Sequence, residues 1–298
     1  MTSIALVTAA AARDLDEDLP PLIAAFAATD AQIEIVNWDD ANANWSAFDL
    51  AVLRSTWDYT QRLPEFLAWT AQVATRTRLL NPFDVVRWNT DKHYLAHLSA
   101  AGVPTVSSTF AEPGADASAA LDAFLRTHAD FSEYVVKPSV GAGSRDAQRY
   151  GRGDEAAATR HMNRLLDGCR SVLLQPYLGR IDDHGETALI FIDGAFSHAI
   201  RKGPLLKRGE DPTRALFAAE HIMPRTPSAD ELAVAEKTLA AIPFAKPLLY
   251  ARVDLIHDDD GAPRVLELEL TEPSLFFAHA PGAAERFAKA TRERVPAS

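Results

Sequence analysis

The chain has 298 residues, of which 47% are hydrophobic and 24% charged, the balance of an ordinary globular protein with room for one large unit or two to three subdomains. Its formal net charge of −11 argues against sequence-independent binding to nucleic acid or to anionic membranes, because both require a basic surface. Cys169 is the only cysteine, which excludes an intrachain disulfide and favours a reducing compartment. Since neither a signal-peptide pattern nor a long apolar run is present, we expect a cytoplasmic protein.

Strand-like and helix-like segments alternate over the first hundred residues, at 4–8, 20–28, 33–38, 50–54 and 64–75. Such βαβ alternation predicts a parallel sheet that binds ligands at the carboxyl ends of its strands. The stretch LRSTWDYT at 53–60 lies at one such end, so four of its residues are candidates to face a substrate: Arg54, Thr56, Trp57 and Asp58. A plain loop with a packing tryptophan fits the same stretch almost equally well.

A helix is predicted within residues 89–105. Thr90 is its expected N-cap, Gly102 its expected end, and Pro104 follows beyond it. We expect a domain boundary close to this point.

The stretch SEYVVKPSVGAGSRDAQRY at 132–150 predicts a strand that ends in Lys137 and opens into a loop with Gly141, Gly143 and Ser144. Glycines let backbone N–H groups approach phosphate oxygens, and Lys137 adds a positive charge. The loop matches neither the P-loop nor the Rossmann fingerprint. A glycine turn between two strands would explain it equally well.

A helix at 154–166, a strand at 171–178 and an acidic loop at 179–186 come next. Residues 187–204 then predict a hairpin that turns at Asp193 and Gly194. This hairpin delivers His198, Arg201 and Lys202, which could also be solvated strand residues.

A second hairpin is predicted from LLYARVDLIHDDDGAPR and RVLELELTEP, with its turn at Asp260 and Gly261. Alternation places the leucines of LELEL on one face and Val265, Glu267 and Glu269 on the other. If the faces of the two strands align, Asp254 joins the two glutamates and Arg252 lies beside them. Three carboxylates supply the hard oxygen ligands that Mg²⁺ prefers, and Mg²⁺ commonly completes its coordination with substrate phosphates. A solvated acidic face is the plainer interpretation of the paired glutamates alone.

Taken in order, these pieces resemble the ATP-grasp enzymes, particularly the branch near glutathione synthetase and D-alanine–D-alanine ligase. The likeness runs from about residue 90 to 274 and is looser before that. It is carried by Lys92, the Lys-Pro pair with its glycine loop, and the stretches QPYL, GETALIFIDG, RVDL and LELE. The resemblance implies an α/β fold with α+β subdomains. A βαβ substrate-side domain would span residues 1–103, and two subdomains clasping ATP would follow, a small lid at 104–170 and a C-terminal part with the metal site at 171–298.

The resemblance also implies roles for individual residues. Lys92 and Lys137 match the lysines that hold the nucleotide phosphates, and the loop from Gly141 through Gly143 to Ser144 resembles a flexible lid over them. Gln175, Tyr177 and Leu178 match the hinge that contacts adenine. Glu186 matches the acidic residue that holds the ribose hydroxyls, and Asp182 or Asp183 are alternatives for that role.

Asp254, Glu267 and Glu269 match the magnesium ligands, and Arg252 matches an arginine that stabilises the acyl phosphate. Many relatives carry asparagine where this chain has Glu269, which leaves the coordination open. The cofactors implied are ATP and magnesium, with two ions expected and manganese as a substitute.

The stretches RSTWDY, SHAIRKGP and LELELTEPSLFF resemble a smaller ATP-grasp branch that includes the O-ureidoserine cyclo-ligase of cycloserine biosynthesis. This resemblance implies that the substrate's own carboxylate is activated as an acyl phosphate and that a C–N bond then closes the ring, from O-ureido-D-serine to D-cycloserine. The side chains expected to hold such a substrate are Arg54, Thr56, Arg201, Thr271 and Ser274.

Three alternatives stay open at this point: an intermolecular dipeptide or glutathione-like ligase, a non-catalytic ATP-binding module, and a kinase-like protein that stops at phosphoryl transfer. The partner expected is a small amino-acid-like molecule, neither a nucleic acid nor a membrane. Homo-oligomer formation is left open.

Overall fold

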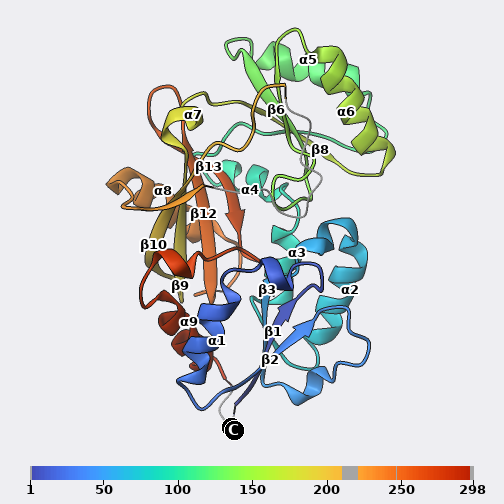
Figure 1. Ribbon diagram of the computed structural model, residues 1–298. Helices are drawn as coiled ribbons and strands as arrows, with labels where there is room; N and C mark the ends of the chain where they lie inside the picture. The colour runs from blue at the N-terminus through green and yellow to red at the C-terminus, as the bar shows by residue number, and fades with distance from the viewer. Residues whose placement is uncertain (1, 210–220, 246, 296–298) are drawn as a thin grey trace.

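A computed structural model describes residues 2–209, 221–245 and 247–295 of the chain. Its strands form three sheets, and Figure 1 shows the N-terminal sheet at the bottom, a small sheet with two helices at the top, and the largest sheet between them. This arrangement confirms the predicted α/β fold class with α+β subdomains.

The N-terminal sheet has the strand order β2-β1-β3-β4, and all of its pairs are parallel, as the βαβ alternation predicts. Its strand β3 is buried along its whole length, which is typical of a parallel strand covered on both faces. The elements of this part are β1 (Ser3–Thr8), η1 (Arg13–Leu15), α1 (Leu19–Ala27), β2 (Gln32–Asn37), η2 (Trp45–Ala47), β3 (Leu50–Ser55), η3 (Trp57–Gln61), α2 (Leu63–Val73), β4 (Arg78–Leu80) and α3 (Phe83–Asn89).

The helix predicted from Thr90 onward is shorter than expected. The Thr90 N–H donates to Val86 in the last turn of α3, so Thr90 is a C-cap and its prediction as an N-cap is wrong. A separate helix, α4 (Tyr94–Ala100), begins after a turn in which the His93 N–H donates to the Asp91 carboxylate. Gly102 follows α4 with φ +79°, the left-handed conformation that commonly ends a helix.

The small sheet has the order β5-β8-β6-β7, and its pairs are antiparallel. The boundary predicted at residue 171 assigns the strand now labelled β8 to the C-terminal part, but β8 pairs with β5 and β6 in the small sheet. Its elements are β5 (Thr109–Ala111), α5 (Ala117–Thr127), β6 (Glu133–Pro138), β7 (Gln148–Gly151), α6 (Glu155–Asp167) and β8 (Val172–Pro176).

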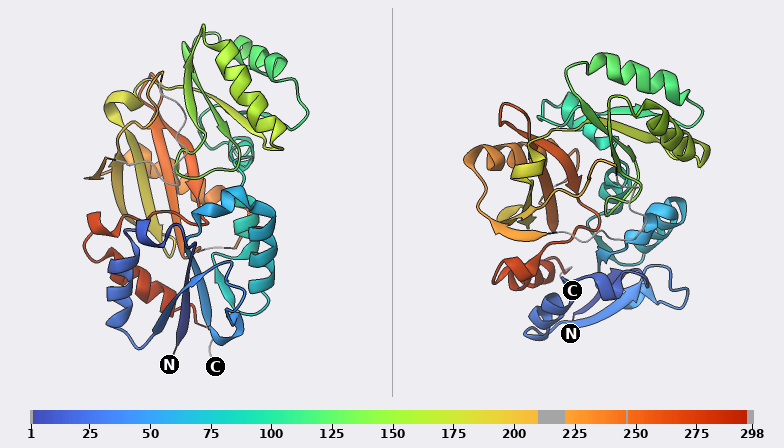
Figure 2. Two further views of the ribbon diagram at one scale, coloured as in Figure 1. Left: turned by 45° about the vertical axis from the view of Figure 1, so that its right-hand side comes forward. Right: turned by 45° about the horizontal axis from the view of Figure 1, so that its top comes forward.

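The large antiparallel sheet has the order β11-β10-β9-β12-β13 and contains both predicted hairpins. Helix α9 packs against α1, which joins the end of the chain to its beginning, and Figure 2 shows both termini at the same end of the molecule. The elements of this part are α7 (Ile181–His184), β9 (Glu186–Ile192), β10 (Ala195–Lys202), β11 (Ile222–Arg225), α8 (Ala229–Ala241), β12 (Tyr250–His257), β13 (Pro263–Glu269), η4 (Phe277–His279) and α9 (Ala283–Arg292).

A register shift interrupts the β12–β13 pairing between Asp254 and Leu255. Val265 lies opposite Leu255 and Glu267 opposite Asp254, so Leu266 is the additional residue of a bulge. Val265 therefore packs in the core with Leu268, whereas Leu266 lines a pocket. The strict alternation predicted for this strand is wrong at these two positions, because a bulge reverses the faces beyond it.

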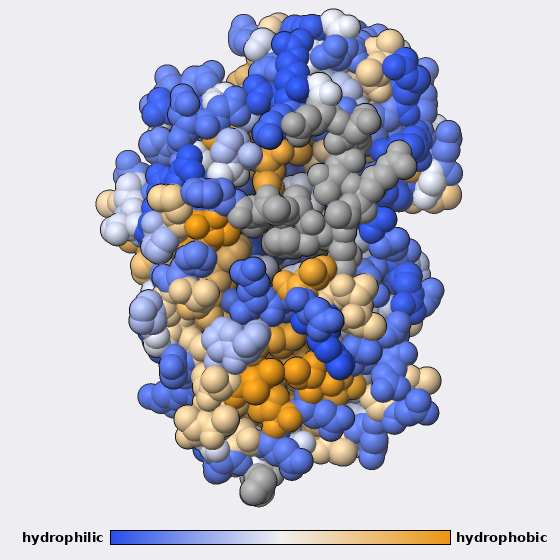
Figure 3. Space-filling model, in the orientation of Figure 1, coloured by the Kyte–Doolittle hydropathy of each residue, from blue (hydrophilic) through white to orange (hydrophobic). Residues whose placement is uncertain are grey.

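One hydrophobic core joins different parts of the chain. Leu6 and Ile4 of β1 share a cluster with Ile190 of β9 and Phe287 of α9, so the N-terminal and large sheets are packed together. The face seen in Figure 3 is hydrophilic toward the top, and apolar side chains gather on its lower half. No helix in the described part of the chain is both long and apolar enough to cross a bilayer.

Candidate active site

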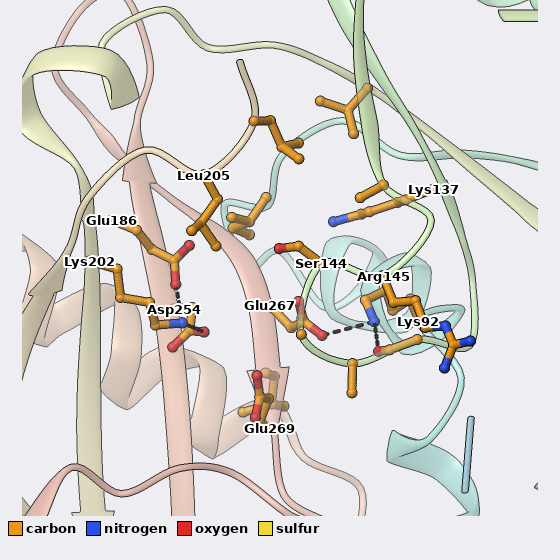
Figure 4. A pocket seen from close by; sticks show the side chains of 18 of the residues that line it. Lys92, Lys137, Ser144, Arg145, Glu186, Lys202, Leu205, Asp254, Glu267 and Glu269 are labelled. Atoms are coloured by element: carbon orange, nitrogen blue, oxygen red, sulfur yellow. Dashed lines mark hydrogen bonds and ion pairs between the residues drawn. The ribbon is translucent and has the colours of Figure 1, made fainter. Parts of the chain in front are cut away.

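A pocket is enclosed by the small sheet, the large sheet and the N-terminal domain, and Figure 4 shows it from close by. Trp57 and Tyr59 contribute to its wall from η3, which directly follows β3. The pocket therefore includes the carboxyl end of a parallel strand, where the sequence predicts a ligand.

The carboxylates of Asp254, Glu267 and Glu269 face this pocket together with Arg252. The strand register places Asp254 opposite Glu267 and Arg252 opposite Glu269. The predicted convergence of these four side chains on one face of the hairpin is confirmed.

Arg252 holds two of these carboxylates. Its Nε and Nη2 donate to the two oxygens of Asp254, each at 2.8 Å, and Nη2 also pairs with Glu269. Burial alone would raise the pKa of Asp254, but Arg252 and Lys202 outweigh it and lower that pKa. Burial raises the pKa of Glu269 to about 7, because the attraction of Arg252 only partly offsets the desolvation.

Lys202 of β10 lies between two further carboxylates. Its Nζ is 2.8 Å from Asp254 Oδ2 and 2.5 Å from Glu186 Oε1, as the dashed lines in Figure 4 show. Burial raises the pKa of Glu186 to about 8 despite this lysine. A buried negative charge at Glu186 thus depends on a nearby cation.

Lys92 and Lys137 approach the carboxylates from the opposite side of the pocket (Figure 4). Lys92 Nζ lies 2.9 Å from Glu267 Oε1 and donates to the Gly141 carbonyl at 2.8 Å. Burial lowers the pKa of Lys137 to about 8; the attraction of Glu267 opposes this shift, and the repulsion of Lys92 adds to it. An anion bound between these lysines would be desolvated and strongly attracted.

The loop after β6 lies over the same space. Gly141, Gly143 and Ser144 all line the pocket, and both Gly143 and Ser144 have positive φ, at +60° and +57°. The sequence prediction of a glycine loop beside Lys137 is confirmed in its placement. Its role as a lid stays a prediction.

The hinge predicted at the end of β8 also borders the pocket, through Gln175, Tyr177 and Leu178. Gln175 Nε2 donates to Ser108 Oγ at 2.9 Å, and the Tyr177 hydroxyl donates to Asp182. Arg149 lies 3.6 Å above the Tyr177 ring and ion-pairs with Asp182, which fixes this edge of the pocket. Asp182 is therefore already engaged by two partners.

The donor chemistry of the acidic face suits a magnesium ion, because Asp254, Glu267 and Glu269 offer hard oxygens from adjacent strands. Each of the three is at present ion-paired to lysine or arginine. Within residues 2–209, 221–245 and 247–295, no three His, Cys, Asp or Glu side chains lie close enough to hold one ion. The residue types fit the metal, and its coordination stays a prediction.

Arg54 and Thr56, predicted to contact a substrate, do not line the pocket. Arg54 is only 1% exposed and ion-pairs with Asp18 at 3.3 Å. Asp18 in turn accepts hydrogen bonds from the backbone N–H groups of Leu275 and Phe277. Through Asp18, Arg54 therefore stabilises the backbone of the segment at 275–277, and its position does not support direct substrate contact.

Of the other predicted residues, Ser274 lines the pocket, whereas Arg201, Thr271 and Asp183 do not. Arg201 donates to the backbone carbonyls of Asp183 and His184, on the outer side of β10. Thr271 is buried, with its hydroxyl directed at Asn89. Direct contacts from these three side chains are not supported by this arrangement.

Several pocket residues have no role in the sequence prediction. The sequence prediction gives Lys202 no role and allows it to be a solvated strand residue, although its alternation with Arg201 places it on the opposite, inward face. Glu272 lies beyond the end of β13, where no periodicity indicates its direction. Trp57, which the sequence places toward a substrate, does line the pocket, and Tyr59 lines it without having been predicted. Asp58, also predicted, does not line it and accepts a hydrogen bond from the Trp38 indole instead.

The chain resembles known proteins along its whole length. Residues 4–81 match the family model of the N-terminal domain of D-cycloserine synthetase DcsG. The cycloserine biosynthesis protein DcsG of Streptomyces lavendulae is 43% identical over 299 residues, covering 99% of both chains. A crystal structure of D-cycloserine synthetase DcsG superposes with a TM-score of 0.92 at 42% identity, covering 99% of this chain and 100% of that one.

A more distant structure, the ATP-grasp ligase PsnB with a precursor variant, Mg and ADP, has a TM-score of 0.65 at 18% identity and covers 99% of each chain. At this identity the likeness concerns the fold alone, and it agrees with the ATP-grasp architecture expected from the sequence. Because the identity to the Streptomyces protein extends over essentially all of both sequences, the chain belongs to the DcsG family and has the ATP-grasp fold.

Proposed function

We propose that this protein is an ATP-dependent ligase that activates the carboxylate of O-ureido-D-serine as an acyl phosphate and closes the ring that leads to D-cycloserine. The observation that carries the proposal is a single pocket in which Lys92 and Lys137 face the Arg252–Asp254–Glu269 ion-pair group, in a chain 43% identical to a cycloserine biosynthesis protein.

ATP binding is assigned to the side of the pocket nearest the small sheet. Lys92 and Lys137 would hold the phosphates, with backbone N–H groups of the loop at Gly143 and Ser144 beside them. Gln175 lies at the end of β8, within the hinge where the base would bind. In an acidic protein, these lysines supply the local positive charge that a polyphosphate requires.

Arg252 is assigned to the reacting centre. A carboxylate that attacks the γ-phosphoryl group must approach another anion, and a buried guanidinium stabilises the charge on both. Arg252 is held for this task by Asp254 and by the Ser274 carbonyl, to which its Nη1 donates at 3.1 Å. These contacts hold its planar group at the wall of the pocket, where the phosphates and the substrate carboxylate would bind.

Ring closure follows when the substrate's own nitrogen attacks the acyl carbon, so that a C–N bond forms and the bond to the phosphate oxygen breaks. Because cycloserine lacks the carbamoyl group of the ureido substrate, that group must also leave by hydrolysis. Holding both reacting ends in one pocket makes the attack intramolecular, with effective molarities that can reach roughly 10⁵ M. No second amine site is required.

Asp254, Glu267 and Glu269 would hold magnesium, and we propose two ions. When bound, magnesium neutralises charge on the phosphates. Arg252 and Lys202 pair with the acidic residues in its absence and would shift toward the phosphates or the remaining carboxylates.

The test supplies purified protein with ATP, magnesium and O-ureido-D-serine and follows ADP, phosphate and cycloserine. We expect all three products without an added amine. ADP formed only when a separate amino acid is present would instead indicate an intermolecular ligase. ATP binding without turnover on any of a panel of amino acids would indicate a non-catalytic module.

A further inference from the structure

Glu272 differs from the other acidic residues of the pocket. Five carboxylates line it among the described residues: Glu186, Asp254, Glu267, Glu269 and Glu272. The first four each have a lysine or arginine partner. Within the described part of the chain, Glu272 forms no ion pair, and its Oε2 is buried without a hydrogen-bond partner.

The surroundings of Glu272 hold it in place. It is only 7% exposed, and the hydroxyl of Tyr59 interacts with its carboxyl and opposes the rise of its pKa. The Trp57 indole N–H donates to the Glu272 carbonyl at 3.0 Å, which ties this segment to the N-terminal domain. A buried carboxylate that keeps one oxygen unpartnered is costly unless something with positive charge or a donor group completes it.

The position of Glu272 relative to Arg252 indicates what that group is. Arg252 donates to the carbonyl of Ser274, two residues after Glu272, and Ser274 also lines the pocket. An α-amino acid whose carboxylate lies beside Arg252 carries its ammonium group one carbon away. Glu272 lies on the same segment and faces the same pocket, so it is placed to receive that ammonium.

The aromatic residues of the wall favour the same ligand chemistry. Tyr59 and Trp57 are 3% and 6% exposed and border the pocket beside Glu272. A primary ammonium can donate to Glu272 and lie against an aromatic face, whereas an anion would be repelled by the carboxylate. Lys92 is paired with Glu267, and no lysine or arginine within residues 2–209, 221–245 and 247–295 forms an ion pair with Glu272.

We propose that Glu272, with Tyr59 and Trp57, is the site that binds the α-ammonium group of the amino-acid substrate and thereby orients its carboxylate toward Arg252. This inference rests on the proposed function and adds a specificity site to it. The site selects amino acids over simple carboxylic acids. It also requires no metal ion.

The experiment compares the wild type with Glu272→Gln, which has nearly the same shape but no charge, and with Glu272→Asp. Steady-state ADP release is measured with O-ureido-D-serine and with its deamino analogue, 3-(ureidooxy)propanoate. ATP affinity is measured by calorimetry. Glu236→Gln on the exposed face of α8 is the matched control.

We expect Glu272→Gln to raise the KM for O-ureido-D-serine by about 10- to 100-fold, since a hydrogen bond to a charged group is lost. The deamino analogue should be a poor substrate for the wild type, and Glu272→Gln should use it no worse than the wild type does. Glu272→Asp should recover part of the lost affinity. ATP affinity should be unchanged in all variants.

Two results would overturn the inference while leaving the proposed function intact. In the first, the wild type turns over O-ureido-D-serine and the KM of Glu272→Gln for this substrate is the same as that of the wild type. The other is a loss of ATP affinity or of magnesium dependence in Glu272→Gln, which would place Glu272 in the phosphate site. If the wild type accepts only another amino acid, the same comparison is made with that compound and its deamino counterpart. If it accepts none, both proposals fail.

Discussion

Lys202 and Asp254 are joined across the strand that separates them: the ammonium of Lys202 on β10 lies 2.8 Å from Asp254 on β12, and β9 lies between the two strands. The same ammonium contacts Glu186 of β9. Lys202 therefore neutralises two buried carboxylates on two different strands. Its side chain is 7% exposed, so water does little to replace it.

The first prediction is that Lys202→Met lowers stability strongly, by about 3–5 kcal/mol, because buried carboxylates lose their partner. Magnesium should recover more stability in this variant than in the wild type, since the acidic face then has a free negative charge to bind it. Thermal unfolding with and without magnesium measures both effects. Lys289→Met, on an exposed helix face, is the control and should change little. If magnesium raised the stability of Lys202→Met and Lys289→Met equally, Lys202 would not be the cation that neutralises the acidic face.

The second prediction concerns Lys137, because burial lowers the pKa of its ammonium group to about 8. Below that pH the side chain is charged and attracts phosphate; above it the charge is lost. The affinity for ATP should therefore fall between pH 7 and pH 9 in the wild type. Lys137→Met should bind ATP about 10-fold more weakly or worse at pH 7 and should lose this part of the pH dependence. Calorimetry at both pH values, with the exposed Lys237→Met as control, tests this.

The third prediction is that Glu267→Gln abolishes turnover and leaves the fold intact. A neutral amide cannot balance the metal or the Lys92 ammonium, which lies 2.9 Å from it. Lys92 keeps its bond to the Gly141 carbonyl, so the loop should stay in place. We expect ADP formation to fall by about 100-fold or more at saturating magnesium, with an unchanged circular dichroism spectrum. Near-normal turnover would rule out Glu267 as a metal ligand.

The acidic face of this site could be predicted because periodic patterns determine it, whereas Lys92 and the hinge were identified through the resemblance to ATP-grasp enzymes. The hairpin that carries Arg252, Asp254 and Glu267 follows from strand alternation and a turn at an Asp-Gly pair. The bulge at Leu266 could not be predicted from the sequence, because one extra residue in a strand does not change the composition of the segment. The position of a strand end predicts which segment faces a ligand, and on that ground Arg54 was expected to contact the substrate. The direction of its side chain depends on packing in the folded protein, where Arg54 ion-pairs with Asp18.

Glu272 was missed for a related reason. It lies between the last residue of β13 and the η4 turn, in a segment without regular structure. Its direction is set by contacts more than 200 residues apart in the chain, such as the bond from Trp57 to its carbonyl. Neither alternation nor a short motif records such a contact. Only the packed tertiary structure does.

The last prediction uses the stability of the protein to test the burial of Glu272. Burial raises the pKa of this carboxyl from 4.5 to about 8, with Glu269 adding to the shift and Tyr59 opposing it. Between these two pH values the folded protein without substrate holds a proton that the unfolded chain has released, and a bound ammonium group would favour its release. In the substrate-free protein the stability contributed by this group is therefore complete below pH 4.5 and is lost as the pH rises to 8. Glu272→Gln cannot ionise and has no such dependence. The melting temperature of the variant relative to the wild type should therefore rise from pH 5.5 to pH 8.5, by about 2 °C or more. Glu236→Gln should show no such trend. A constant difference across this range would mean that Glu272 is ionised throughout and already has a cationic partner in the folded protein.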